Sequence, residues 1–166
     1  IAPFTHAQCA SPVVWVRKLN GEYRMCVDFK VTINPLIESD SYPLESPETI
    51  FSNMADANYF AKLDLRHAYF QIELDEEAKK WSVINTSKGL YQVTRLQMGM
   101  KNASHIFQRC MENILRGIDS TAIFQDDVLV NGTTKNDLKK RLDQIKKRLM
   151  EHNVSINWNK SIEITE

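Results

Sequence analysis

The hydrophobic positions of this 166-residue chain follow two spacings, one typical of strands and one typical of helices. The Asn20-Gly21 pair predicts a hairpin turn between the first two strands, and Gly89 predicts a second hairpin. Short runs rich in β-branched and aromatic residues predict strands at 13–16, 23–29, 59–65, 81–86, 90–96, 154–158 and 161–165, of which the last two are expected to pair.

Other segments carry apolar residues at helical spacing. Ser46-Pro47 supplies a capping serine and a first-turn proline for a helix near 47–55. A second helix is expected over 102–117, where Gly117 marks the end, and a third over 134–152. Because strands and helices interleave without a strict strand–helix–strand rhythm, the expected fold class is α+β.

Composition excludes several classes of protein but does not indicate a binding partner. The 21 basic and 21 acidic residues balance, so the net charge gives no direct sign of nucleic acid. With 43% hydrophobic residues the chain fits one domain or two small lobes. Three cysteines without CxxC spacing indicate neither a zinc site nor a disulfide framework, and no apolar run is long enough for a membrane span. We expect an intracellular segment of a longer protein, cytoplasmic or nuclear.

Two adjacent carboxylates, Asp126 and Asp127, interrupt an apolar, strand-like stretch at 123–130. A buried, unpaired carboxylate is costly or loses its charge, and a divalent cation is the usual remedy. Carboxylate oxygens select Mg²⁺ or Mn²⁺, and Asp64, in a similar apolar strand, could complete a site for phosphoryl transfer. The alternative is that Asp126-Asp127 simply forms a polar turn between two strands.

Several blocks of sequence, spread over nearly the whole chain, carry a family resemblance. They are Ser11–Val14, Tyr23–Phe29, Tyr42–Leu44, Leu63–Ile72, Gly99–Ala103 with Phe107–Arg109, and Phe124–Asp127. In this order they resemble the reverse transcriptases of gypsy-class LTR retrotransposons, or a gene derived from one.

The resemblance implies the fingers and palm of a right-hand polymerase, with an antiparallel palm sheet backed by helices. Residues 1–40 would form part of the fingers, with the hairpin near 13–29, and residues 41–80 the first palm part with Asp64. Residues 81–100 would form a second fingers or palm hairpin, and 101–166 the palm part with Asp126-Asp127. The thumb, connection and ribonuclease H regions are expected to be absent, so this piece alone should synthesise weakly or not at all.

The resemblance also implies an activity, namely RNA-directed DNA polymerisation at a primer 3′ end. Asp64, Asp126 and Asp127 would be the catalytic residues and would hold Mg²⁺, with Mn²⁺ as an alternative. The expected partners are a primed RNA or DNA template, deoxynucleoside triphosphates and the remainder of a longer polyprotein or host protein, with no membrane.

Further residues match the family's contacts to substrates. Tyr69 stands where the family sets an aromatic gate against a ribose 2′-hydroxyl, although an ordinary core tyrosine is the alternative. The basic stretch at 135–148 could reach nucleic acid, but a solvated helix face is favoured. The expected nucleotide contacts are Lys18, Arg24, His67, Ala68, Tyr69 and Met98, with weaker matches to nucleic-acid contacts at Lys101, Asn102, Phe124 and Lys160.

The chain departs from its family at supporting positions. Phe124-Gln125 replaces a tyrosine and a small or aliphatic residue, and Gln97-Met98 replaces a proline-phenylalanine pair. Ser104, Lys30 and Ser161 stand where proline, arginine and cysteine are usual. None of these changes removes a carboxylate, but altered support alone can cost about 10–100-fold in metal affinity or activity.

Two other functions compete with polymerisation. A catalytically inactive, host-adopted domain could bind nucleic acid or protein, which the altered residues and the neutral charge favour. A metal-dependent nuclease would also use a carboxylate cluster. Lys18, Arg24 and Tyr69 argue against the nuclease, since it needs no triphosphate pocket.

Overall fold

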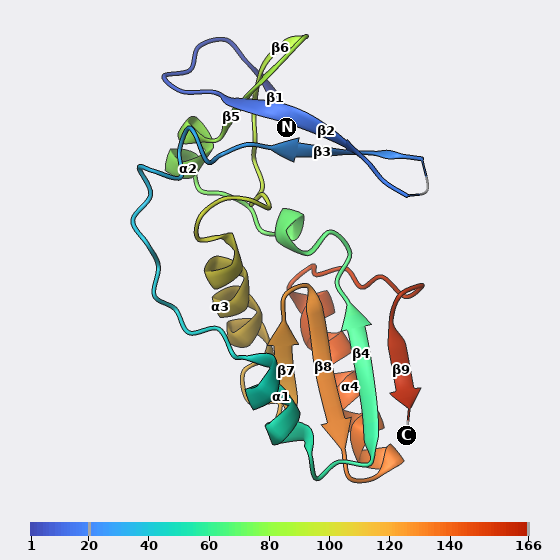
Figure 1. Cartoon of the computed structure of the whole chain (residues 1–166). Helices are drawn as coiled ribbons and strands as arrows, with labels where there is room; N and C mark the ends of the chain where they lie inside the picture. Colours follow the sequence, from blue (N-terminus) through green and yellow to red (C-terminus); the bar gives the residue numbers. More distant parts are fainter. Residues whose placement is uncertain (20, 166) are drawn as a thin grey trace. The chain divides into compact units, whose positions relative to one another are not determined.

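The computed structural model describes residues 1–19 and 21–165, so the predicted turn residue Asn20 lies outside the described residues. The chain divides into two compact units (Figure 1). The first unit comprises Ile1–Ser41 and Tyr69–Ala103, and the second comprises Tyr42–Ala68 and the segment from Ser104 onward.

The first unit is built on a five-stranded sheet with the order β1-β6-β5-β2-β3. Neighbouring strands run antiparallel, except that β2 and β5 are parallel. The predicted strand at 81–86 begins only at Val83, because Trp81 ends a short helix that Asp75 caps. The elements are β1 (Ala2–Phe4), β2 (Ser11–Arg17), β3 (Tyr23–Val27), α2 (Glu76–Trp81), β5 (Val83–Thr86) and β6 (Gly89–Gln92).

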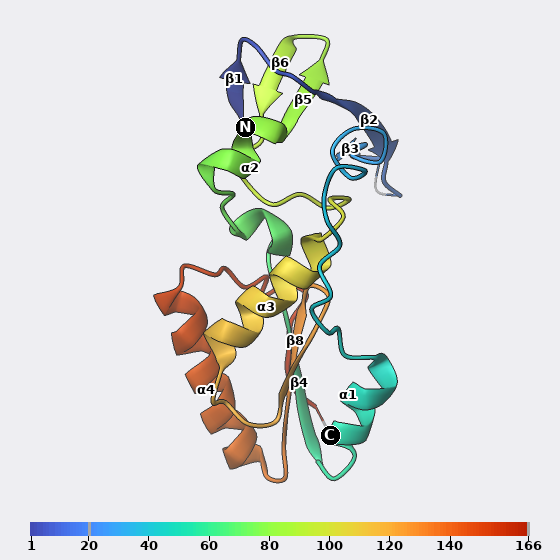
Figure 2. The same cartoon turned by 90° about the vertical axis from the view of Figure 1, so that its left-hand side faces the viewer.

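The second unit is a four-stranded antiparallel sheet with the order β7-β8-β4-β9, backed by helices. This confirms the α+β class and the antiparallel sheet expected from the sequence. Figure 2 shows α4 on one side of β4 and β8 and α1 on the other. The elements are α1 (Pro47–Met54), β4 (Tyr59–Asp64), α3 (Ala103–Leu115), β7 (Thr121–Phe124), β8 (Asp127–Gly132), α4 (Lys135–Glu151) and β9 (Ile162–Thr165).

The helices of the second unit form where apolar spacing, and at Ser46 a predicted cap, place them. The Ser46 hydroxyl accepts a hydrogen bond from the Thr49 backbone N–H at 3.2 Å, and Thr134 caps α4 in the same way. Four apolar side chains of α4 recur every three or four residues and are buried, which makes α4 the main cover of β8 and β4. They are Leu138, Leu142, Ile145 and Leu149.

The end of the described chain differs from the predicted strand pair. Residues 154–158 form no strand, and only Ile156 makes an isolated bridge, to Leu65. Strand β9 pairs instead with β4, through Phe60 and Lys62. The prediction was wrong because a short apolar run indicates only an extended backbone. Which strand it pairs with depends on the sheet edge that is available in the folded chain.

Gly132, at the end of β8, allows close approach of the first turn of α4. A Cβ atom at this position would lie 2.7 Å from the Leu138 backbone nitrogen and 3.0 Å from its Cα. Both neighbours are backbone atoms and cannot rotate away, so even one methyl group needs the strand and the helix to separate.

We therefore expect Gly132→Ala to lower the free energy of unfolding by about 1–3 kcal/mol, as overpacking does elsewhere. Urea unfolding measures the change. Gly117→Ala is the matched control, since Gly117 has φ of +83° but an added methyl group would meet no atom of the described residues within 4 Å beyond its chain neighbours. The control therefore tests backbone strain without a clash. A smaller loss for Gly132→Ala than for Gly117→Ala would contradict the steric argument.

Candidate active site

The β7–β8 hairpin places Asp126 and Asp127 at its turn. Phe124 pairs with Asp127, so Gln125 and Asp126 are the two loop residues. Gln125 has φ of +56°, a left-handed conformation that costs a non-glycine residue about 1–3 kcal/mol. The stretch at 123–130 is therefore two strands and a turn rather than a single strand. The predicted polar turn and the predicted carboxylate site occupy the same residues.

Exposure at the turn corrects one premise of the sequence argument. Asp126 is exposed, and Asp64 and Asp127 are half-buried, so none of these carboxylates is enclosed in an apolar core. The unfavourable energy that a cation would offset is therefore mainly the repulsion among the three carboxylates, and loss of hydration contributes less.

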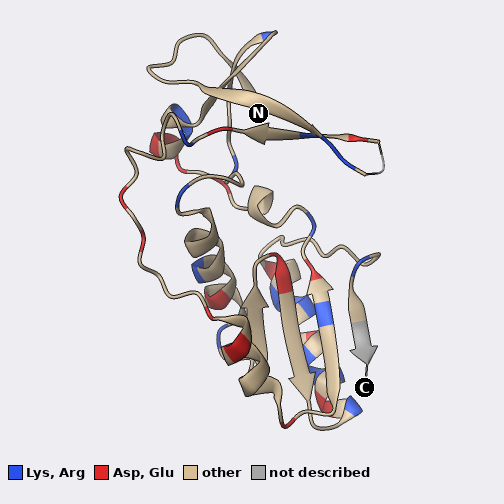
Figure 3. Cartoon of the chain, in the orientation of Figure 1, with Lys and Arg blue, Asp and Glu red and all other residues tan. Residues whose placement is uncertain are grey.

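Sheet register brings the third carboxylate to the same place. Asp64 is the last residue of β4 and lies directly opposite Asp127 of β8. The Leu65 N–H donates to the Asp126 carbonyl oxygen at 2.9 Å, which ties the hairpin turn to the end of β4. Figure 3 shows the acidic ends of β4 and β8 next to each other. Like charges placed opposite each other on neighbouring strands are destabilising, so this arrangement needs compensation.

Lys62 supplies part of that compensation, and sequence reasoning missed it. Its Nζ donates to Asp127 Oδ2 at 2.7 Å. This hydrogen bond raises the pKa of Lys62, and the negative charges of Asp127, Asp64 and Asp126 add to the effect against partial burial. The available signal was the spacing: Lys62 precedes Asp64 by two residues, so both side chains leave β4 on one face.

The donor set suits a hard divalent cation. Asp127 Oδ1 is buried and has no hydrogen-bond partner among the described residues, as expected of an oxygen available to a metal. Among all the residues that the structure describes, no three His, Cys, Asp or Glu side chains are already arranged to hold an ion. Asp127 instead forms an ion pair with Lys62. The residues Asp64, Asp126 and Asp127 thus fit Mg²⁺ chemically, in a cluster that an ammonium group neutralises in part.

Ser161 supports Asp64 from the segment before β9. Its Oγ accepts a hydrogen bond from the Asp64 backbone N–H at 3.0 Å and donates to the Asn157 carbonyl at 2.9 Å. The Asn157 N–H in turn donates to the Asp64 carbonyl oxygen at 2.8 Å. The serine at this position therefore makes two hydrogen bonds that a cysteine thiol would make only weakly, because S–H is a poor donor and S a poor acceptor.

The remaining predicted contacts are distributed over both units. Phe124 and Lys160 belong to the second unit with the carboxylates, as do His67, which has φ of +51°, and buried Ala68. Residues assigned to the first unit are Lys18, Arg24, Tyr69, Met98, Lys101 and Asn102.

Several of the first-unit side chains already have partners in the fold. Lys18 Nζ donates to Glu22 Oε2 at 2.8 Å, at an exposed site. Lys101 Nζ donates to the Ile37 carbonyl at 2.8 Å, and Asn102 Nδ2 donates to the Glu38 carbonyl at 2.7 Å. Lys101 and Asn102 thus fasten the segment at 37–38, and their contact with nucleic acid stays a prediction.

The altered Gln97-Met98 pair divides into a buried and an exposed residue. Gln97 is buried, and its Nε2 donates to the Arg95 carbonyl at 3.2 Å, which satisfies an amide placed where proline is usual. Met98 is 55% exposed and presents an apolar surface. Arg24 lies on β3 opposite Val16, and Tyr69 lies in a 3₁₀ turn (Ala68–Gln71).

Comparison with known proteins settles the family. Residues 16–165 match the family described as Reverse transcriptase (RNA-dependent DNA polymerase). The chain belongs to the reverse transcriptase family.

Relatives of this reverse transcriptase chain include proteins of animals and their transposons. It is 34% identical over 162 residues to an uncharacterized protein of Caenorhabditis elegans, covering 96% of this chain and 13% of that protein. It is 31% identical over 144 residues to the retrovirus-related Pol polyprotein from transposon gypsy of Drosophila melanogaster, covering 86% of this chain and 14% of that protein. The chain thus spans only a small part of these relatives.

Solved structures support the same fold. The foamy viral protease-reverse transcriptase in complex with an RNA/DNA hybrid superposes with a TM-score of 0.87 at 19% identity, over 96% of this chain and 21% of that chain. This likeness establishes the reverse transcriptase fold. None of the helices in the described part of the chain is long and apolar enough to cross a membrane.

We expect Ser161→Ala to lower the free energy of unfolding by about 1 kcal/mol, because the Asp64 N–H loses its acceptor. Ser161→Cys should recover only part of the loss. Urea unfolding checks both. Ser52→Ala, at an exposed position of α1, is the control and should change stability by less than about 0.5 kcal/mol. Equal effects of Ser161→Ala and Ser52→Ala would contradict the supporting role of Ser161.

Proposed function

We propose that this chain supplies the catalytic centre of an RNA-directed DNA polymerase, which adds deoxynucleotides to a primer 3′ end. The observation that carries the proposal is the register that sets Asp64 opposite Asp127, beside the turn residue Asp126. Membership of the reverse transcriptase family supports it. A gypsy-class origin, in a retrotransposon or a gene derived from one, is part of the proposal and is supported by the order of the motif blocks and by the gypsy relative.

In the reaction, the primer hydroxyl attacks the α-phosphate of the nucleotide in line, and pyrophosphate leaves. Asp64 and Asp126 would hold Mg²⁺, or Mn²⁺ in its place, with Asp127 completing the cluster. Such ions, when bound, activate the attacking oxygen and neutralise charge on the leaving group. The protein's own part is to hold three carboxylates at one strand end, fixed by the β4–β8 register, the Leu65–Asp126 hydrogen bond and Ser161.

The expected partners follow from this reaction. A primed RNA or DNA template and deoxynucleoside triphosphates would be the substrates, and the remainder of a longer polyprotein or host protein would supply further contacts. Lys18 and Arg24 are proposed to contact the triphosphate, because a guanidinium or ammonium group suits phosphate oxygens. We expect the reaction to take place inside the cell, in the cytoplasm or nucleus.

The first test uses Asp126→Asn, which keeps the shape of the side chain and removes its charge. Titration calorimetry with Mn²⁺, with and without a deoxynucleoside triphosphate, should show nucleotide-dependent metal binding in the unaltered chain. The variant should lose more than about 100-fold in metal affinity, beyond the usual effect of a supporting residue. Primer extension, wherever the unaltered chain shows it, should be abolished.

Asp119→Asn is the matched control, since Asp119 is an exposed aspartate of the second unit before β7. It should behave like the unaltered chain. Undiminished metal binding in Asp126→Asn would overturn the assignment. Binding of nucleic acid that ignores Mg²⁺ and survives replacement of Asp64 would favour an inactive binding module.

A second expectation concerns sugar selection by Tyr69. The proposal assigns its ring to steric exclusion of a ribose 2′-hydroxyl. Tyr69→Val should reduce the preference for a deoxynucleotide over a ribonucleotide by about 10–100-fold, typical of discrimination by pocket shape. Tyr69→Phe keeps the bulk and should retain the preference. Competition binding of the two nucleotides in Mn²⁺ measures the ratio, and an unchanged ratio in Tyr69→Val would remove the gate role.

A further inference from the structure

Lys62 is placed by the sheet to reach across to the opposite strand. It pairs with Leu129 in the β4–β8 register, and Asp127 is two residues before Leu129. Lys62 and Asp127 are therefore diagonal neighbours on one face, about 7–8 Å apart at the backbone, a distance that a long side chain spans. The separation of 2.7 Å between Lys62 Nζ and Asp127 Oδ2 shows that it does so.

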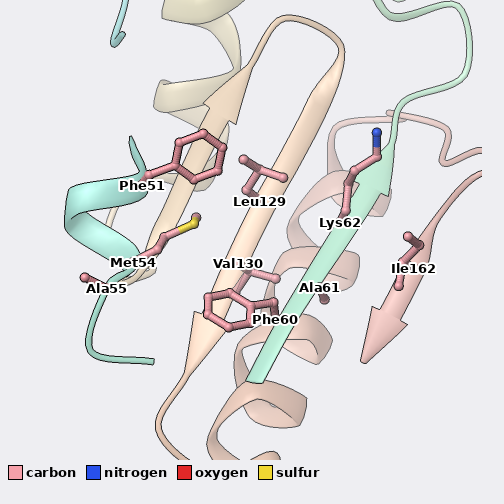
Figure 4. A pocket seen from close by; sticks show the side chains of 9 residues that line it. All are labelled: Phe51, Met54, Ala55, Phe60, Ala61, Lys62, Leu129, Val130 and Ile162. Atoms are coloured by element: carbon pink, nitrogen blue, oxygen red, sulfur yellow. The ribbon is translucent and has the colours of Figure 1, made fainter. Parts of the chain in front are cut away.

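The methylene stem of Lys62 lies on an apolar surface, so its ammonium group is directed away from that surface. An apolar groove of about 450 Å³ in the second unit is lined by Lys62 with Phe60, Leu129, Ile162 and residues of α1. Figure 4 shows the Lys62 side chain rising from β4 at one end of this groove, with its nitrogen away from the apolar residues. Methylene groups on apolar surface with a charged tip directed outward are typical of lysine.

The environment of the ion pair distinguishes it from an ordinary surface contact. The Asp127 side chain is 19% exposed, and its other oxygen, Oδ1, is buried with no hydrogen-bond partner in the described part of the chain. The Lys62 side chain remains 41% exposed, so its ammonium has a path to solvent. The lysine can therefore leave the cluster, whereas Asp64 and Asp127 are fixed by the paired strands β4 and β8.

We propose that Lys62 is a built-in counter-cation of the carboxylate cluster, occupying it in the metal-free chain and competing with the divalent ion for Asp127. This inference rests on the proposed function for the identity of the ion, and on the ion pair itself for the role of Lys62. The lysine is a positioning residue: it holds the repelling carboxylates together before metal arrives, and it weakens metal binding because it must be displaced.

The test compares Lys62→Met, which keeps the length and apolar character of the stem, with Lys62→Arg, which keeps the charge. Mn²⁺ binding without nucleotide is measured by titration calorimetry. Lys62→Met should lower the dissociation constant for Mn²⁺ about tenfold, within the usual range of coupling between two bound groups. Lys62→Arg should stay near the unaltered value, and so should Lys139→Met, at an exposed lysine of α4. Equal or weaker Mn²⁺ affinity in Lys62→Met would overturn the competition.

A metal-free measurement separates this inference from the proposed function. In EDTA, Asp127→Asn should lower the melting temperature of the unaltered chain, because an attraction is lost. In the Lys62→Met background the same change should raise it, because only repulsion among the carboxylates remains. That reversal of sign would support Lys62 as a counter-cation even if no variant bound Mn²⁺. Absence of Mn²⁺ binding would instead contradict the proposed metal site. The same sign in both backgrounds would refute the role of Lys62.

Discussion

Mutual repulsion of carboxylates at one end of a sheet is the constraint on which the second unit depends. Asp64 and Asp127 face each other across neighbouring strands, and Asp126 precedes Asp127 at the turn. Like charges opposite each other destabilise a strand pair, so stability alone would favour keeping these carboxylates apart. The β4–β8 pairing must therefore be held by interactions away from the charges, and Lys62 must reduce the repulsion at the end itself.

Those distant interactions are the apolar contacts of α4 with the sheet. Leu63, Val128 and Val130 are at most 1% exposed, and they alternate with the residues on the opposite face of β4 and β8. A slip of one residue would turn this apolar set outward and would also separate Asp64 from Asp127, because side chains alternate with a period of two. The close approach at Gly132 sets how near the helix can come. Core packing and the geometry of the candidate site are thus specified by the same register.

The main features of this unit could be predicted from the sequence where the signal was local. Helical spacing predicted α1 and α4, the Ser46 cap added to the signal for α1, and the motif order singled out three aspartates, two of which the register places opposite each other. What escaped prediction depends on pairing between distant segments. Spacing alone puts Lys62 on the same face of β4 as Asp64, but its contact with Asp127 follows from the pairing of β4 with β8, which local sequence does not reveal. The pairing of β9 with β4 likewise follows from the sheet edge that is available. The expectation of buried carboxylates was wrong for exposed Asp126 and half-buried Asp64, because an apolar run of this length can form two strands and a turn as readily as one strand; Asp127 alone keeps a buried oxygen without a hydrogen-bond partner among the described residues.

The departures from the family show how a site of this kind tolerates change in its surroundings. Gln97 and Ser161 each place a polar group where another residue is usual, and each makes a hydrogen bond to the backbone nearby. Gln125 occupies a left-handed turn position at an exposed site, where its amide is accessible to water and the backbone strain is one that an aliphatic residue would also carry. The altered positions therefore meet their hydrogen-bonding needs locally and leave the carboxylates in register. The strand register places Asp64 opposite Asp127, and the altered neighbours add local support to it, so replacing these neighbours is expected to change the stability of the arrangement more readily than its geometry.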